Sequence, residues 1–310
     1  RTNWLSKYSV DSPRPKALVS LAMASTPKFA EKYKTMKVSI SDGVCVATMC
    51  AKDEVGLNLL TGRLFREFAD VVEHVATDEA VRVFVLRSSD EDFWLAHFDI
   101  NAILKLPTPG PQVKETVPNS WHTLCDVLRN MPKATIAEVC GRAGGGGNEF
   151  AMNFDMRFGV RGKTKFAQME VPLGISPGGT GCIKLPQLVG VGRAMEIILG
   201  GVEIDAEEAE RYGLLNRVFP DNASMQAHVA ALAARIASFP PEGVRAAKAS
   251  VLAAESMPRR EACLENLSLF NATLSNPEAK RRMKAFMEHG GQTREGELDL
   301  QGTLAKLSKL

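Results

Sequence analysis

Four consecutive glycines, Gly144 to Gly147, lie between two apolar stretches of different character. The stretch before them, Ala134 to Val139, is typical of a buried strand, and the stretch that begins at Asn148 is typical of a helix. Glycine has no β-carbon, so its backbone N–H groups can lie close to a ligand. At the start of a helix such groups favour a developing negative charge. The run therefore predicts a strand, a tight loop and a helix, with N–H donors available to an anion.

Two carboxylates belong to this region. Glu149 directly follows the glycine run, and Glu170 ends the next motif, Phe166-Ala167-Gln168-Met169-Glu170. Backbone donors beside paired carboxylates suit chemistry in which an oxyanion forms while protons move. Each glutamate taken alone is more often a solvated surface charge.

Other interpretations of the glycine run are weaker or less specific. It can be an ordinary turn or linker. A phosphate-binding loop needs Gly-Lys-Ser/Thr at its end, and none follows Gly147. A dinucleotide fingerprint needs the spacing G-x-G-x-x-G, which Gly144 to Gly147 fit badly.

The order of the predicted elements is that of an α/β protein, because strands alternate with helices as in stacked βαβ-type units. The elements expected are a hairpin at 37–50 around Asp42-Gly43, a helix at about 60–75, strands at 81–86 and 134–139, a helix led by Asn119 and another that starts at Asp205. From about 222 to 288 the pattern is helical, and prolines divide it into at least three helices.

The chain is therefore divided into four parts. We expect an N-terminal extension at 1–36, an α/β core at 37–221, a C-terminal helical region at 222–288 and a tail at 289–310.

Charge and composition disfavour several classes of function. The net charge is +2 and no basic stripe interleaved with aromatic residues occurs, so no nucleic-acid partner is expected. No run of 18 apolar residues occurs, so no membrane-spanning helix and no membrane partner are expected. The six cysteines form no CxxC pair and no Cys/His metal spacing, so no metal site is expected. His122, His228 and His289 fall in helical patterns and are expected at the surface.

The last three residues, Ser308-Lys309-Leu310, form the tripeptide that the peroxisomal import receptor reads. They predict a peroxisomal protein with that receptor as a partner.

Several motifs, taken together and in order, resemble the crotonase (enoyl-CoA hydratase/isomerase) superfamily from about Lys37 to Ala285. The motifs are the strand 81–86 with the loop that ends at Asp99-Ile100, the glycine loop 143–149, the run 166–170 with 173–179, and the runs 191–195 and 206–214. Each is weak alone, and their order and spacing make the set specific.

The resemblance implies a crotonase-like core of stacked ββα turns, arranged as a spiral, with a C-terminal helical region. It also implies assembly as a homotrimer or hexamer. The implied substrate is an acyl-CoA thioester, so coenzyme A arrives as part of the substrate and no separate cofactor is expected.

The resemblance further implies an oxyanion hole of two backbone N–H groups, which hold the thioester oxygen as it becomes an enolate. One donor falls on Gly146. The other is Phe98 when counted back from Asp99, which we favour, and His97 when counted forward from Phe93. The substrate-binding residues implied are Leu95, Ala96, Asp99, Gly145 and Gly178.

The paired glutamates favour one activity within the superfamily. Hydratases resemble this chain in carrying both, whereas isomerases often keep only one. With both present, the resemblance implies addition of water to a 2-enoyl-CoA or the reverse dehydration. Glu149 would deprotonate the water and Glu170 would supply the proton at C2.

The sequence also departs from the family pattern. Trp94, Leu95, His97 and Phe98 stand where the family usually has small residues, and such bulk could reshape or plug the acyl-CoA site. Two alternatives therefore stay open: double-bond migration or C–C bond cleavage through the same enolate, and a non-catalytic binding protein that keeps the fold.

Overall fold

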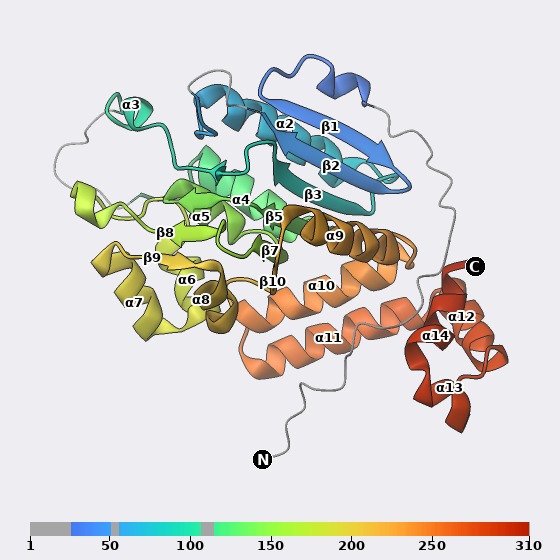
Figure 1. The fold of residues 1–310 in the computed structure, drawn as a ribbon. Helices are drawn as coiled ribbons and strands as arrows, with labels where there is room; N and C mark the ends of the chain where they lie inside the picture. The colour runs from blue at the N-terminus through green and yellow to red at the C-terminus, as the bar shows by residue number, and fades with distance from the viewer. Residues whose placement is uncertain (1–25, 51–55, 107–114, 310) are drawn as a thin grey trace.

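The computed structural model describes residues 26–50, 56–106 and 115–309, and the predicted extension lies mostly outside these ranges. The chain forms the mixed α/β architecture expected, with two sheets and a helical C-terminal region (Figure 1).

The larger sheet has six strands in the order β1-β2-β3-β5-β7-β10. Their bounds are β1 Met36–Ser41, β2 Val44–Met49, β3 Val83–Ser88, β5 Ala134–Val139, β7 Met156–Val160 and β10 Arg217–Phe219. The first two strands pair antiparallel through the predicted hairpin, in which Asp42 and Gly43 both have positive φ. All later neighbours are parallel.

The smaller sheet has four short strands in the order β4-β6-β8-β9. They are β4 Phe93–Leu95, β6 Arg142–Gly144, β8 Lys165–Ala167 and β9 Glu203–Asp205. Along the chain, β3 and β4, β5 and β6, and β7 and β8 each place one strand in each sheet. This alternation produces the predicted spiral of ββα turns. Because β4, β6 and β8 are parallel, the segment after β4, the glycine run at the end of β6 and the segment after β8 lie at one end of the smaller sheet.

Both faces of the larger sheet are covered, because successive side chains on a strand point to opposite sides. Phe84 and Leu86 of β3 face a core shared with α2 Gly62–Thr77, α4 Ser120–Asn130 and α5 Gly146–Ala151. Val83 and Val85 face the core beneath α9 Asn222–Ala237. The predicted stripe of α2 is buried throughout: Leu64, Phe68, Val71, Val72 and Val75.

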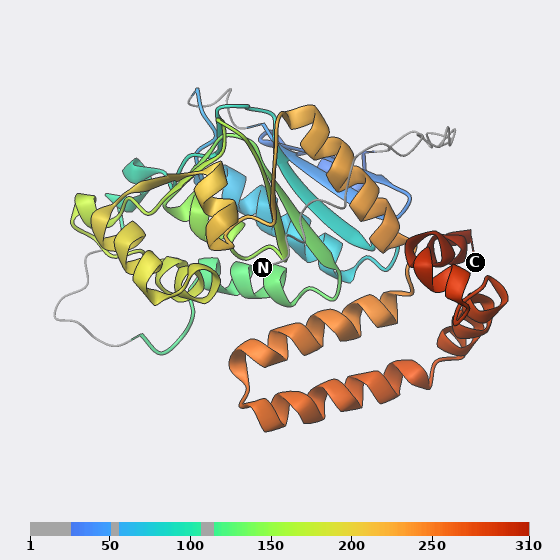
Figure 2. The same ribbon diagram turned by 60° about the horizontal axis from the view of Figure 1, so that its bottom comes forward.

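Helices α6 Gly181–Val189 and α7 Val191–Gly200 lie between β8 and β9 along the chain. Helix α8 Ala206–Tyr212 follows β9, and Asp205 caps it with a capping box. The C-terminal helices α10 Pro241–Ser256 and α11 Arg259–Leu274 form a pair that projects from the α/β body (Figure 2). Helix α12 is Pro277–Glu288.

The predicted tail contains regular structure: α13 Arg294–Leu298, α14 Leu300–Ala305 and the 3₁₀ turn η4 Lys306–Lys309. Within the described residues, no helix has the length and apolar character needed to span a bilayer.

Candidate active site

The glycine run makes a turn that only glycine tolerates at its centre. Gly145 has φ +45° and ψ −120°, a conformation that residues with a β-carbon rarely adopt. Its N–H donates to the carbonyl of Ala167 on β8 at 2.9 Å, and its carbonyl accepts from the N–H of Glu149 at 2.9 Å. A β-carbon on Gly145 would lie 2.7 Å from Oε1 of Glu170. Gly145 is therefore needed for both the turn and the position of that carboxylate.

The backbone nitrogen of Phe98 lies close to Gly146. A β-carbon on Gly146 would be 3.6 Å from the backbone nitrogen of Phe98. The parallel bridge between Leu60 and Phe98 uses the carbonyl of His97 and the N–H of Asp99, which turns the Phe98 N–H away from that bridge. In the described part of the chain neither N–H has a hydrogen-bond acceptor. This geometry favours Phe98 over His97 as the second donor.

Glu149 is buried and held by backbone donors. Its Oε1 accepts from the N–H of Gly179 at 3.0 Å and from the N–H of Gly181 at 2.9 Å. Burial raises the pKa of Glu149 above its ordinary value, while these backbone N–H groups and the nearby His122 act in the opposite direction. The carboxylate is thus fixed in orientation, and its burial favours the protonated form.

Glu170 is buried beside Glu149. Burial, and secondarily the negative charge of Glu149, raise the pKa of Glu170 to about 7. Oε2 of Glu170 accepts from Nε2 of Gln168 at 3.2 Å. A β-carbon on Gly181 would lie 2.7 Å from Nε2 of Gln168 and 3.0 Å from Oε1 of Glu149. The Gln168 amide therefore lies between the two carboxylates.

The other predicted site residues occupy several environments. Leu95 is buried in the core, and Ala96 is buried and accepts from the N–H of Gly144 through its carbonyl at 2.9 Å. Asp99 caps the short helix α3 Ile100–Ile103. Gly178 is exposed on the loop before α6. Nδ1 of His97 lies 2.8 Å from the carbonyl of Phe98.

Two of the large side chains in the segment 94–98, Trp94 and Leu95, are buried inside the protein. Trp94 is fully buried and packs against Phe150 and Phe154. Trp94 thus lies in the core formed with these rings.

Sequence reasoning missed two groups that order the carboxylates. Asn148 donates through Nδ2 to Oε1 of Gln168 at 2.8 Å, and both side chains are fully buried. His122, expected at the surface, is half-buried, with Nε2 2.7 Å from the carbonyl of Gly179. Both contacts join distant parts of the chain, so no local pattern signals them.

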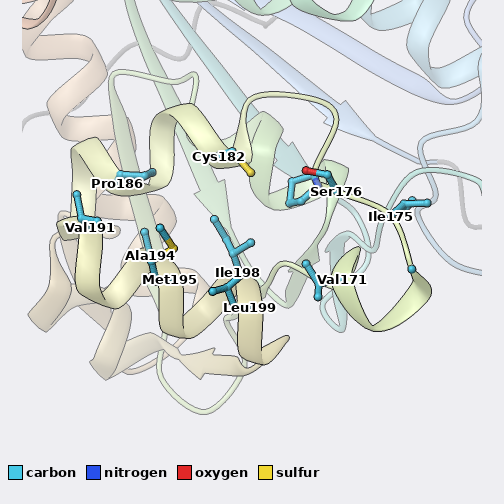
Figure 3. Close-up of a pocket in the computed structure, with 12 residues that line it drawn as sticks. Val171, Ile175, Ser176, Cys182, Pro186, Val191, Ala194, Met195, Ile198 and Leu199 are labelled. Carbon is cyan, nitrogen blue, oxygen red and sulfur yellow. The ribbon is translucent and has the colours of Figure 1, made fainter. Parts of the chain in front are cut away.

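An apolar hollow of about 500 Å³ is lined by Val171, the residue after Glu170, and by other apolar side chains (Figure 3). It lies between the turn η3 Val171–Leu173, the loop at 174–177, α6 and α7, and side chains such as Val171, Met195 and Leu199 line it. In the described ranges, no group of three or more His, Cys, Asp or Glu side chains could hold a metal ion.

Comparison with known proteins finds the same family by sequence model and by individual relatives. The family model described as enoyl-CoA hydratase/isomerase matches residues 39–295. The chain is 30% identical to the probable mitochondrial enoyl-CoA hydratase of Dictyostelium discoideum, over 79% of this chain and 88% of that protein. It is 32% identical to the probable enoyl-CoA hydratase of Rhizobium meliloti strain 1021, over 82% and 95%.

A solved structure of enoyl-CoA hydratase subunit I from Geobacillus kaustophilus HTA426 superimposes with a TM-score of 0.71 at 27% identity. The match covers 84% of this chain and 98% of that one.

Proposed function

The chain belongs to the enoyl-CoA hydratase/isomerase family, and on that premise we propose that it adds water to a 2-enoyl-CoA thioester. The observation that carries this proposal is a pair of buried carboxylates, Glu149 and Glu170, beside the unpaired N–H groups of Phe98 and Gly146.

The two N–H groups bind the thioester carbonyl oxygen. When a nucleophile adds at C3, the π electrons of the C2=C3 bond move toward C1 and the carbonyl oxygen gains negative charge. Donors already aimed at that oxygen stabilise the enolate without any reorganisation.

The two carboxyl groups carry the protons. Glu149 in its ionised form takes one proton from water as the water oxygen bonds to C3. Glu170 in its protonated form gives its proton to C2 and completes a 3-hydroxyacyl thioester. A carboxyl whose pKa is about 7 holds its proton part of the time at neutral pH and can release it.

The direct test is hydration of crotonyl-CoA by the purified protein, followed by loss of the absorbance of the conjugated thioester and by product mass. The expected product is heavier by one water. A product of unchanged mass would instead identify double-bond migration, and a shortened acyl chain from a suitable substrate would identify C–C cleavage. Tight binding without turnover of any enoyl thioester would identify a binding protein.

We further propose that the protein acts in the peroxisome. The support is Ser308-Lys309-Leu310, of which Ser308 is exposed and Leu310 lies outside the described residues. A fluorescent protein fused ahead of the chain should reach peroxisomes, and the same fusion without Leu310 should not. Because the Dictyostelium relative is named as mitochondrial, delivery of both fusions to mitochondria is the contrary result.

Assembly as a homotrimer or hexamer is supported by exposed apolar surface. No side chain of α11 is buried, although Leu264, Leu267 and Phe270 lie on it. Val191, Met195 and Leu199 of α7 are more than half exposed. A helix with no buried side chain gains little stability alone, and clustered exposed apolar residues mark contact surfaces. Light scattering should give the mass of three or six chains, and a monomer at every concentration would contradict this.

A further inference from the structure

Trp121, in the first turn of α4, carries a buried donor next to the catalytic carboxylates. Its side chain is 8% exposed, and its ring packs against Phe65, Phe98 and Phe150 with centroids 6.4, 6.3 and 5.7 Å away. Three aromatic neighbours fix the plane of the indole and hence the direction of its N–H.

The indole N–H has no partner in the part of the chain that the structure describes. Buried donors are normally hydrogen-bonded, so an unpaired one calls for an explanation. The position of Gly179 shows where this donor lies. A β-carbon on Gly179 would be 2.6 Å from Nε1 of Trp121 and 2.3 Å from Oε2 of Glu149. Since both atoms are within 2.6 Å of one point, they are no more than about 5 Å apart.

The other half of this arrangement is the second oxygen of Glu149, Oε2. Oε1 accepts both backbone N–H groups, from Gly179 and Gly181. The N–H of Thr180 also stabilises the ionised carboxyl group, and no side chain of the described residues donates to Oε2. Nε1 of Trp121 and Oε2 of Glu149 therefore lie near each other with no direct hydrogen bond between them. One water oxygen can join them, at about 2.9 Å from the nitrogen and about 2.7 Å from the carboxylate oxygen.

We propose that Trp121 is a catalytic residue whose Nε1–H donates to the oxygen of the water that Glu149 deprotonates. This rests on the proposed hydration. The water oxygen uses one lone pair to accept from Trp121 and the other to form the bond to C3. One O–H bond breaks as its proton passes to Oε2 of Glu149, and the second hydrogen stays on the new hydroxyl. The π bond between C2 and C3 opens, and C2 receives the proton of Glu170.

The donor has two effects on that step. It fixes the lone pair of the water in line with C3, and it withdraws electron density from the oxygen, which makes the O–H proton easier to remove. In the reverse direction the same N–H binds the 3-hydroxyl as the leaving water. The substrate class that this site accepts is therefore a thioester with an oxygen substituent at C3 or an electrophilic C3.

A matched pair of variants tests the proposal. Nε1 of Trp94 is also buried and without a partner in the described residues, and its ring also packs on Phe150. Trp121→Phe and Trp94→Phe each remove one buried indole N–H and replace the indole by the smaller phenyl ring. We expect Trp121→Phe to lower kcat for crotonyl-CoA hydration by about 10- to 100-fold with little change in KM. Trp94→Phe should leave kcat unchanged.

A second reaction separates catalysis from packing. Exchange of the C2 protons of butyryl-CoA in D₂O uses the oxyanion hole and Glu170 but no water nucleophile. Trp121→Phe should keep the wild-type exchange rate while losing hydration. An equal loss of both rates, or hydration at the wild-type rate, would overturn the role of Trp121.

If Trp121→Phe does not fold, benzothienylalanine at position 121 replaces the N–H by sulfur in a ring of the same shape and gives the same comparison. Absence of hydration in the wild-type protein would count against the proposed function itself, which distinguishes the two failures.

Discussion

Gly147 and Leu95 are in backbone contact: a β-carbon on Gly147 would lie 1.9 Å from the carbonyl oxygen of Leu95 and 2.9 Å from its carbonyl carbon. No rotation of a side chain can relieve such a clash. The contact presses the first turn of α5 against β4, and this sets the spacing between the N–H groups of Gly146 and Phe98.

Gly147→Ala should therefore lower the free energy of unfolding by about 3 kcal/mol or more, the upper end of the range for overpacking a core. Gly192 in α7 serves as the control, because a β-carbon there would meet no atom of another segment within 4 Å. Gly192→Ala should leave stability unchanged or raise it by up to about 1 kcal/mol, because alanine is the better helix former. Urea unfolding measures both. Equal stability of the two variants would mean that α5 and β4 can separate at no cost.

Replacement of Glu149 or Glu170 by glutamine is predicted to affect hydration and C2-proton exchange differently. In Glu149→Gln the amide oxygen can still accept from Gly179 and Gly181, so the loop should hold while hydration falls by about 10² or more. Exchange of the C2 protons of butyryl-CoA should persist, because it needs only Glu170. Glu170→Gln should lose both reactions. The opposite pattern, with exchange lost only in Glu149→Gln, would exchange the two roles.

The predictable part of the fold was the set of turns, helices and caps whose sequence pattern lies within a few consecutive residues. The Asp42-Gly43 turn, the α2 stripe from Leu64 to Val75 and the Asp205 cap each depend on residues within a few positions of one another. The three-residue strands β4, β6, β8 and β9 are too short to show a period. The same holds for α13 and α14 in the predicted tail.

The two glutamates and the glycine run were predictable through their resemblance to a family, but the contacts that tune them were not. Gln168 comes from the segment after β8, Gly179 from the loop before α6 and Trp121 from α4. Only the spiral brings these three segments together. No pattern along the chain could indicate that an indole nitrogen lies within about 5 Å of an oxygen of Glu149.

The raised pKa of Glu170 predicts a specific pH dependence. In the exchange reaction Glu170 must be ionised to accept the C2 proton, so the rate should rise with pH to a plateau with a midpoint near 7. The charge of Glu149 is the second cause of the raised pKa, so Glu149→Gln should move the midpoint to lower pH. Measurement of exchange rates from about pH 5 to about pH 9 checks this. A midpoint that stays in place would mean that burial alone sets the pKa.

Stability should depend on pH through Glu138 on β5, which is 1% exposed and lies 3.0 Å from Nε of Arg87 on β3. Burial raises the pKa of Glu138 from 4.5 to about 7, and the positive charge of Arg87 opposes that rise. Removal of the charge by Arg87→Met should raise the pKa further. A carboxyl with a raised folded-state pKa contributes full stability below its unfolded value, and that contribution is lost as pH rises through the folded value.

Arg87→Met should therefore cost more stability at pH 8, on the order of 3–5 kcal/mol for a broken buried pair, than at pH 5. Adding Glu138→Gln to Arg87→Met removes the titrating group, so the double variant should show a much smaller difference between the two pH values. Urea unfolding of wild type and both variants at each pH measures the differences directly. A loss of equal size at pH 5 and pH 8 would mean that Arg87 stabilises the sheet through packing of its stem and not through its charge.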